Sequence, residues 1–411
     1  MTSYSSIMFF IPTQDPTMRH SEKDSSSIIS VFGDNLVPEI RIILNYTGTS
    51  SVSLQRVEIL GSTFLRMHHT TYDEDRICDL LRDNDPRLER FEVKGPRILL
   101  CCPSFVEFLS AVRVNASVKT VSLRELTVQA LSQEQLNELL QALSHIETLE
   151  ALEVAIPHVN HDAKVTSDTL LQLFRRSSNL KTLFLWPFVT VDGQGAIDAL
   201  SEAVLQCSKM KQLALLNILL TDDDENLSFD PLLASLSNLP ELEVLQIAAG
   251  LQANARCPIG ETALANLVRS SSLNGLAVRN LGLNDRHCAI LAEFLEQSSS
   301  DSEPETRPLQ VLDLRFNAIS GDGYHVLRQA LENNFSLHWL ETDLANKEMQ
   351  LEIDFLLLLN RAGRFTYLKD PTATRREKID VFSRTEDSLD AIYFLLTRNP
   401  TICGVPDASA S

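Results

Sequence analysis

Few residues in this sequence have the types and spacing that chemistry requires. The best candidate for a metal site is the segment His158-Val-Asn-His161-Asp162, whose two imidazoles are spaced to share one helical turn. The segment contains no cysteine and follows an apolar alternation typical of a strand, so an ordinary polar loop is the alternative interpretation. We interpret His68–His69 and Cys101–Cys102 likewise as ordinary residues and not as metal ligands, and we expect no metal site.

Motifs of catalysis and of nucleotide binding are missing from the sequence. There is no G-x-G-x-x-G after a strand, no Walker loop, no H-E-x-x-H and no G-x-S-x-G. Cys207 and Cys288 fall within helical patterns, where a thiol is expected to pack as a small apolar side chain. We therefore predict no catalytic residue, no cofactor and no enzymatic activity.

Composition narrows the classes of partner. The 411 residues include 36 Lys and Arg against 55 Asp and Glu, a net charge of −19, which should repel nucleic acid and anionic membranes. Seven scattered cysteines without a C-x-x-C pair are typical of reduced thiols. The run Ile7–Ile11 is too short for a signal peptide, and no stretch approaches the roughly 18 apolar residues of a membrane span.

We therefore predict a cytoplasmic, monomeric protein that binds neither nucleic acid nor membrane, with the nucleus left open as a location. In such a compartment the four N-x-S/T sequons, at Asn45, Asn115, Asn226 and Asn334, are expected to be accidental.

One apolar pattern recurs along most of the chain. Leu309, Leu312 and Leu314 define the template apolar-x-x-apolar-x-apolar, which recurs at steps of 28 to 36 residues. The other starting positions are Leu54, Leu88, Val118, Leu149, Leu180, Met210, Leu242, Leu273 and Leu337. A sustained period in this range is typical of a solenoid.

Each period predicts one strand followed by one helix. Its first part alternates as a strand with one buried face does. Its second part has helical spacing, with a predicted capping box at Ser132 and Gln135 and a helix start at Asp230-Pro231. Successive strands should then pair in parallel through right-handed crossovers, with their leucines in a single file.

The unit at Leu309 also carries Asn317, Ile319 and Gly323, which complete the pattern L-x-x-L-x-L-x-x-N-x-I-x-x-x-G. This pattern resembles a leucine-rich repeat, and the long, helix-containing period resembles the ribonuclease-inhibitor-like subclass. The resemblance implies an α/β fold, a right-handed horseshoe-shaped solenoid of about ten repeats with a parallel sheet on its concave face and helices on its convex face. Only Asn317 fills the asparagine position of the motif.

The two ends of the chain depart from the repeat. We predict a disordered segment over 1–30, an N-terminal cap over 31–53, the solenoid over 54–348, a helical C-terminal cap over 349–404 and a disordered tail over 405–411. The C-terminal segment is also similar to the closing segments of uncharacterised algal leucine-rich-repeat proteins. A capping box at Ser383 and Glu386 is predicted to begin the last helix.

Strand residues that point away from the leucine file should line the concave face. They include both tryptophans, and exposed Trp and Arg commonly anchor protein interfaces. The candidate partner-binding residues are Arg124, Glu153, Phe184, Trp186, Gln246, Arg279, Asp313, Arg315, Trp339 and Glu341. Alternatively, Trp186 packs under a neighbouring loop and Trp339 packs under the C-terminal cap.

Charge is distributed unevenly along the chain. Between Arg361 and Arg384 there are seven basic residues against three acidic ones, a net charge of +4. This segment would dock on the acidic repeats, bind an acidic partner, or remain a solvated surface.

These patterns favour a non-enzymatic scaffold that binds another protein through its concave face. The alternative is a GTPase-activating-type regulator resembling Ran GTPase-activating proteins, which share the repeat subclass but carry a strongly acidic C-terminal tail. The recognition part of an immune-type receptor is less favoured, because no nucleotide-binding or signalling domain is found ahead of the repeats.

Overall fold

The computed structural model describes residues 55–59, 62–68, 78–79, 81–84, 88–94, 105–124, 132–155, 164–220, 227–250, 259–269, 272–297, 309–370, 372–385 and 388–398. All of these residues fall within the unit that spans residues 52–411. The predicted segments 1–30, 31–53 and 405–411 lie outside the described residues, as do Cys101–Cys102 and His158–Asp162.

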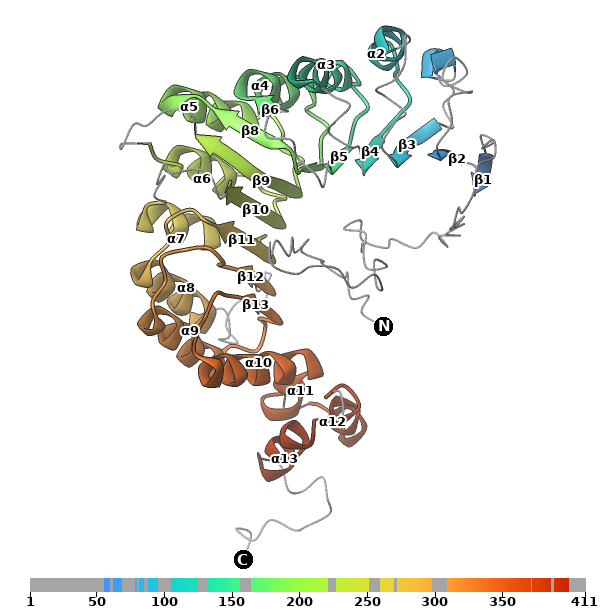
Figure 1. Cartoon of the computed structure of the whole chain (residues 1–411). Coiled ribbons are helices and arrows are strands. Elements are labelled where there is room, and N and C mark those ends of the chain that lie inside the picture. The colour runs from blue at the N-terminus through green and yellow to red at the C-terminus, as the bar shows by residue number, and fades with distance from the viewer. Residues whose placement is uncertain are drawn as a thin grey trace, which may run out of the picture. The chain divides into compact units, whose positions relative to one another are not determined.

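Strands and helices alternate along the described chain (Figure 1). The strands are β1 (Gln55–Ile59), β2 (Ser62–His68), β3 (Leu88–Lys94), β4 (Thr120–Arg124), β5 (Ala151–Ala155), β6 (Lys164–Thr166), β7 (Thr182–Leu185), β8 (Phe188–Val191), β9 (Gln212–Leu220), β10 (Val244–Ala249), β11 (Gly275–Arg279), β12 (Val311–Asp313) and β13 (Trp339–Glu341). The helices are α2 (Phe105–Arg113), α3 (Gln133–Leu143), α4 (Ser167–Arg176), α5 (Gly193–Val204), α6 (Asp230–Ser237), α7 (Glu261–Arg269), α8 (Asp285–Gln297), α9 (Gly321–Asn333), α10 (Lys347–Ala362), α11 (Arg364–Leu368), α12 (Arg375–Phe382) and α13 (Leu389–Arg398).

These strands form one long sheet in the order β1-β2-β3-β4-β5-β7-β9-β10-β11-β12-β13. The pair β1–β2 is antiparallel, and every later pair on this path is parallel. The short strands β6 and β8 pair with each other beside this path, and β8 also pairs with β9. In Figure 1, helices α2 to α9 lie along one face of the sheet, so the described fold is mixed α/β.

Leucines of neighbouring strands are register partners in the sheet. Leu183 pairs in register with Leu213, and Leu245 pairs with both Leu213 and Leu276. The file continues through Leu312 to Leu340, and all of these leucines are at most 5% exposed. The predicted single file of leucines is therefore confirmed. A slip of one residue would turn each strand's leucines to the opposite face, so burial of this file fixes the register.

The backbone just before each strand repeats one hydrogen-bond arrangement. The carbonyl of Glu150 accepts from the amides of Lys181 (2.7 Å) and Thr182 (3.0 Å) of the next unit. The carbonyls of Lys181 and Lys211 likewise each accept hydrogen bonds from two amides of the unit that follows. Each unit is thus held to its neighbour by main-chain bonds that do not depend on side-chain identity.

Two of the three predicted helix starts are confirmed. Ser132 and Gln135 form the predicted capping box of α3, and α6 begins at Asp230 with Pro231 in its first turn. The capping box predicted at Ser383 is wrong, because Ser383 ends α12 and its hydroxyl donates to the Asp380 carbonyl (2.6 Å). The last helix begins instead after Ser388, whose hydroxyl accepts from the Ala391 amide (3.3 Å).

Two of the sequon asparagines are buried structural residues. Asn115 is 2% exposed and Asn334 is fully buried. Asn334 Nδ2 donates to the Leu295 carbonyl (2.8 Å), and its Oδ1 accepts from the Leu337 amide (2.8 Å). Asn115 makes the equivalent bonds to Leu81 and Val118. Neither amide is accessible to a modifying enzyme in the folded chain, in line with the prediction that these sequons are accidental.

Cys207 and Cys288 are also fully buried, as predicted, and burial raises the pKa of each thiol to about 12.

The C-terminal helices add a second, smaller core. Helix α10 contributes Ile353 and Leu357 to the main core, and Leu359 and Ala362 to the second core. The second core also includes Tyr367, Val381, Ala391 and Leu395 from α11, α12 and α13. Asn360 Nδ2 donates to the carbonyl of Leu337 (2.8 Å), and Arg361 Nη1 donates to that of His338 (3.0 Å), beside the last strand.

We expect Asn334→Ala to lower the free energy of unfolding by about 2–4 kcal/mol, because it removes the bonds that this buried side chain makes to the Leu295 carbonyl and the Leu337 amide. Urea unfolding, monitored by circular dichroism, measures the change in this free energy. Asn238→Ala is the matched control, since that exposed side chain donates only within its own helix and should change stability by less than about 0.5 kcal/mol. Equal effects of the two substitutions would contradict the assigned role of Asn334.

Candidate functional site

The residues predicted to bind a partner lie on one surface of the sheet, opposite the leucine file. Five of them, Glu153, Phe184, Gln246, Asp313 and Glu341, lie in one continuous register row, in which Ala214 and Ala277 fill the places on β9 and β11. Arg124 and Arg279 end strands β4 and β11, and Trp186 directly follows β7. We call this surface the strand face.

Most of the strand face is less exposed than the sequence suggested. Trp339 is 43% exposed, and Arg315 and Glu341 are half-buried. The remaining described side chains are at most 8% exposed: Glu153, Phe184, Trp186, Gln246, Arg279 and Asp313. The expectation that this face presents its large side chains to solvent is therefore wrong for these six. Several of these residues contact one another across the strands.

In the N-terminal half of the strand face, side chains of neighbouring positions contact one another. Ser122 Oγ of β4 donates to Glu153 Oε2 of β5 at 2.9 Å, which pairs a buried carboxylate with a buried hydroxyl. The rings of Phe184 and Trp186 pack in a tilted arrangement with their centroids 6.3 Å apart. The alternative in which Trp186 is a packed side chain is the one that agrees with its 8% exposure.

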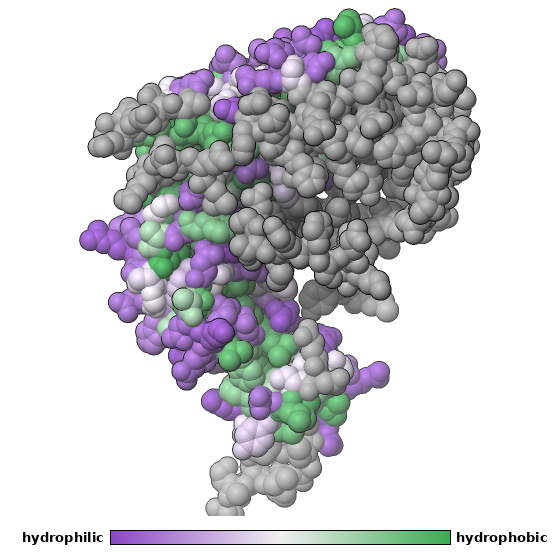
Figure 2. Space-filling view, viewed as in Figure 1, coloured by the Kyte–Doolittle hydropathy of each residue, from purple (hydrophilic) through white to green (hydrophobic). Residues whose placement is uncertain are grey.

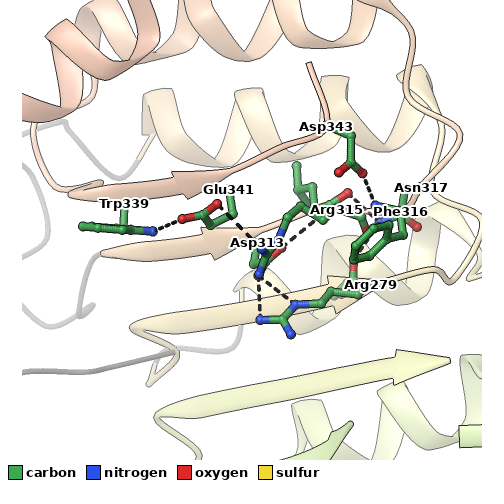
Figure 3. A network of polar contacts seen from close by, with 10 residues as sticks. Arg279, Asp313, Arg315, Phe316, Asn317, Trp339, Glu341 and Asp343 are labelled. Atoms are coloured by element: carbon green, nitrogen blue, oxygen red, sulfur yellow. Dashed lines mark hydrogen bonds and ion pairs between the residues drawn. The ribbon is translucent and has the colours of Figure 1, made fainter. Parts of the chain in front are cut away.

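In the C-terminal half, polar contacts converge on Asp313 (Figure 3). Asp313 is fully buried, and both of its oxygens are used by arginines. Arg279 reaches Oδ2 through Nε (2.7 Å) and Nη2 (2.6 Å). Arg315 reaches Oδ2 through Nη2 (2.7 Å) and Oδ1 through Nε (3.1 Å). This paired, forked geometry explains how a carboxylate can be fully buried in the sheet.

The electrostatics of the two arginines differ. Burial lowers the pKa of Arg279, although the charge of Asp313 acts in the opposite direction. For Arg315, burial also acts to lower the pKa, but the hydrogen bond and charge of Asp313, together with Glu341 and Asp343, outweigh it and raise the pKa. Glu341 Oε2 lies 3.9 Å from Arg315 Nη1 and so extends the network towards the surface.

The network reaches solvent at Trp339. The indole Nε1 donates to Glu341 Oε1 (2.6 Å), and the guanidinium of Arg361 from α10 lies 5.6 Å from the ring centroid. This distance permits a cation–π interaction. Trp339 thus contacts the C-terminal helices without being covered by them, which disagrees with the alternative that it packs under the cap.

Phe316 is a surface residue that the sequence argument missed. It is 45% exposed and has a φ of 63°, a left-handed conformation that is unfavourable for a bulky residue. Its amide donates to Asp343 Oδ2 (Figure 3). The equivalent turn after β11 has Asn280, with a φ of 54° and a residue type that tolerates this region. Comparing these two turn positions would have identified Phe316 as an unusual choice.

Asn317, which completes the repeat motif, joins two consecutive turns. Its Oδ1 accepts from the amides of Leu281 (3.0 Å) and Leu283 (3.1 Å), and its Nδ2 donates to the Val278 carbonyl (2.6 Å). This one side chain therefore holds the turn after β11 to the turn after β12.

No group of three or more His, Cys, Asp and Glu side chains in the described part of the chain could hold a metal ion. None of the helices that the structure describes is long and apolar enough to cross a membrane.

Comparison with known proteins adds little to this picture. No protein-family model matches the sequence. No curated protein matches it either.

Two solved structures are similar to parts of the chain. One is the actin-binding site 2 of leiomodin-1, with 13% sequence identity over 39% of this chain and 86% of that one, at a TM-score of 0.28. Another is a tropomodulin C-terminal domain from Caenorhabditis elegans, with 14% identity over 47% of this chain and 92% of that one, at a TM-score of 0.23. Both likenesses are too distant to bear on the function of this chain.

Asp313→Ala should destabilise the protein by about 3–5 kcal/mol, since it leaves two arginines in the sheet without their carboxylate. The matched control is Glu261→Ala, which removes an exposed ion pair with Arg286 and should cost less than about 1 kcal/mol. Thermal unfolding of both variants gives the comparison. A small effect at Asp313 would mean that the network does not stabilise the sheet.

Proposed function

We propose that this protein is a non-enzymatic scaffold that binds another protein through its strand face, without a cofactor and without nucleic acid or membrane as partner. In this proposal it is a cytoplasmic, monomeric leucine-rich-repeat protein of the ribonuclease-inhibitor-like subclass, a right-handed solenoid of about ten repeats. The aligned leucines, the parallel pairing and the turn-joining role of Asn317 support this assignment.

The observation that carries the binding proposal is the position of Trp339. Most of the strand face consists of buried side chains, whereas 43% of the surface of Trp339 is exposed at the end of the Asp313 network. Phe316, in the turn after β12, exposes a second aromatic side chain. Tryptophan beside arginine and carboxylate is the composition of an interface hot spot. We therefore assign the contact to β12, β13 and the turn after β12.

The rigidity of this surface also favours binding. Glu341 and Arg361 hold the indole of Trp339, and Asp313 holds Arg315, so few rotamers remain to be lost when a partner binds. A preformed surface of this kind keeps the entropic cost of association low.

Crosslinking with mass spectrometry in native extract, followed by an affinity measurement on the identified partner, tests the proposal. Trp339→Ala should weaken that complex by about 30-fold or more, the loss typical of a hot-spot residue. Leu205→Ala is the control, because Leu205 is 42% exposed, as Trp339 is, but follows a helix on the other face of the sheet.

Crosslinks that map to α2–α9, or a complex that both variants leave unchanged, would refute the assignment of the strand face.

A further inference from the structure

One turn of the chain, at the junction of α10 and α11, binds the end of the repeat array through main-chain carbonyls. Arg364 Nη2 donates to the carbonyls of Leu331 (2.8 Å) and Asn334 (2.6 Å) at the end of α9. Asn360 Nδ2 also donates to the Asn334 carbonyl (3.1 Å), and Asn360 and Arg361 bind two further carbonyls just before β13. We call Asn360, Arg361 and Arg364 the clamp, because they hold the segment between α9 and β13.

Arg364 occupies a place that other side chains occupy in earlier units. There, a carbonyl two residues before the end of a helix accepts from a side chain of the next unit, Phe174 of α4 from Cys207 (3.4 Å) and Leu295 of α8 from Asn334 (2.8 Å). Leu331 has the same place in α9, and Arg364 follows it by 33 residues, the separation that also joins Phe174 to Cys207. The clamp therefore takes the place of a further repeat.

Arg364 is an unusual residue for this place, because it is both charged and buried. It is 2% exposed, and none of the ion pairs found among the described residues involves it. Burial lowers the pKa of Arg364 to about 10, although the charge of Glu332 acts in the opposite direction. The last turn of α9 has no basic residue of its own, and the carbonyl end of a helix favours a cation. Arg364 supplies that cation from the next element.

Two aromatic side chains lie beside Arg364. Its guanidinium lies 4.7 Å from the centroid of the Phe335 ring, which packs edge to face with Phe365 at a centroid distance of 5.8 Å. Phe365 is 39% exposed, and Figure 2 shows apolar surface at this C-terminal end of the chain beside hydrophilic surface. A methionine in place of Arg364 should therefore keep an apolar contact with Phe335, while it loses the charge and the two carbonyl bonds.

The clamp also sets the position of Arg361 relative to Trp339. Arg361 Nη1 donates to the His338 carbonyl (3.0 Å), and its guanidinium lies 5.6 Å from the centroid of the Trp339 ring. A cation–π interaction extends to about 6 Å, so a small displacement of α10 is enough to lose it. Asn360 and Arg364, on either side of Arg361, hold that end of α10 against α9.

We propose that Arg364 is a positioning residue for the binding surface at β12 and β13. By holding the end of α10 against α9, Arg364 keeps Arg361 over Trp339 and so fixes the indole before a partner arrives. The proposal rests on the role in binding proposed above for Trp339. It makes the C-terminal helices part of the site, although Arg364 itself is buried and does not touch the partner.

Acrylamide quenching of tryptophan fluorescence tests the positioning role without a partner. The chain has two tryptophans, so Trp186→Phe as a background leaves Trp339 alone. In that background, Arg364→Met and Arg361→Met should each raise the quenching constant of Trp339 about 1.5-fold or more, because either change uncovers one face of the indole. The double variant should quench no more than Arg361→Met alone, since Arg364 acts through Arg361.

Further variants separate positioning from stability. Arg364→Lys keeps the charge and one donor and should restore part of the wild-type quenching. Arg398→Ala is the matched control, since that guanidinium also lies over a ring, 5.1 Å from the centroid of Phe394, but on α13, and it should leave Trp339 unchanged. If Arg364→Met does not fold, Asn360→Ala takes its place, because it loosens the same turn without removing a buried charge. A residue that only stabilised the fold would lower the urea midpoint but leave quenching of the folded protein unchanged.

Three results would overturn the positioning role. One is unchanged quenching of Trp339 in folded Arg364→Met, or in Asn360→Ala where that variant replaces it. Another is that the effects of Arg364→Met and Arg361→Met add in the double variant. The third is an equal rise in Arg398→Ala.

The affinity for the partner identified by crosslinking completes the test. Arg364→Met, with Trp186 retained, should weaken that complex about threefold to tenfold, the loss expected when one more side chain must be ordered on association. Raised quenching with unchanged affinity would show that fixing the indole does not favour binding and would overturn the proposal. A complex that Trp339→Ala does not weaken would instead count against the proposed function itself.

Discussion

Register between neighbouring strands is the constraint on which the rest of the structure depends. Each unit contributes a leucine to the file from Leu183 to Leu340, and burying such a side chain contributes about 2–3 kcal/mol. The carbonyls of Glu150, Lys181 and Lys211 each receive two amides of the next unit. Hydrophobic burial thus selects the register and the backbone bonds hold it, so the position of each strand-face residue follows from the position of the leucine beside it.

This dependence explains which features could be predicted from the sequence. The alternation that identifies the leucines also identifies which residues point the other way, so the strand-face positions of Phe184, Gln246 and Asp313 could be read from spacing alone. The capping box at Ser132 was predictable for a similar reason, since it involves residues only three apart. Both are local consequences of backbone geometry.

Exposure was not predictable, because it depends on neighbours that are far apart in sequence. Arg279 is buried through a carboxylate 34 residues away, and nothing in the local pattern around Arg279 specifies Asp313. Phe316 was missed because its backbone conformation, rather than its place in the alternation, brings it to the surface. Ser383 was assigned to the wrong helix, because a serine that ends one helix and a serine that begins the next have the same local signal.

The contacts of α10 with the last strand have a consequence for assembly. A sheet edge with open carbonyls is a template to which a strand of another molecule can add, and long parallel arrays are at risk of growing end to end. Asn360 and Arg361 already occupy the carbonyls of Leu337 and His338, and Trp339 stands beside them with Arg361 over its ring. The carbonyls of Leu337 and His338 are therefore already bonded when a strand of another molecule approaches, and the indole of Trp339 lies beside them. The same arginine that orients the tryptophan thereby also occupies a carbonyl acceptor at the edge of the sheet.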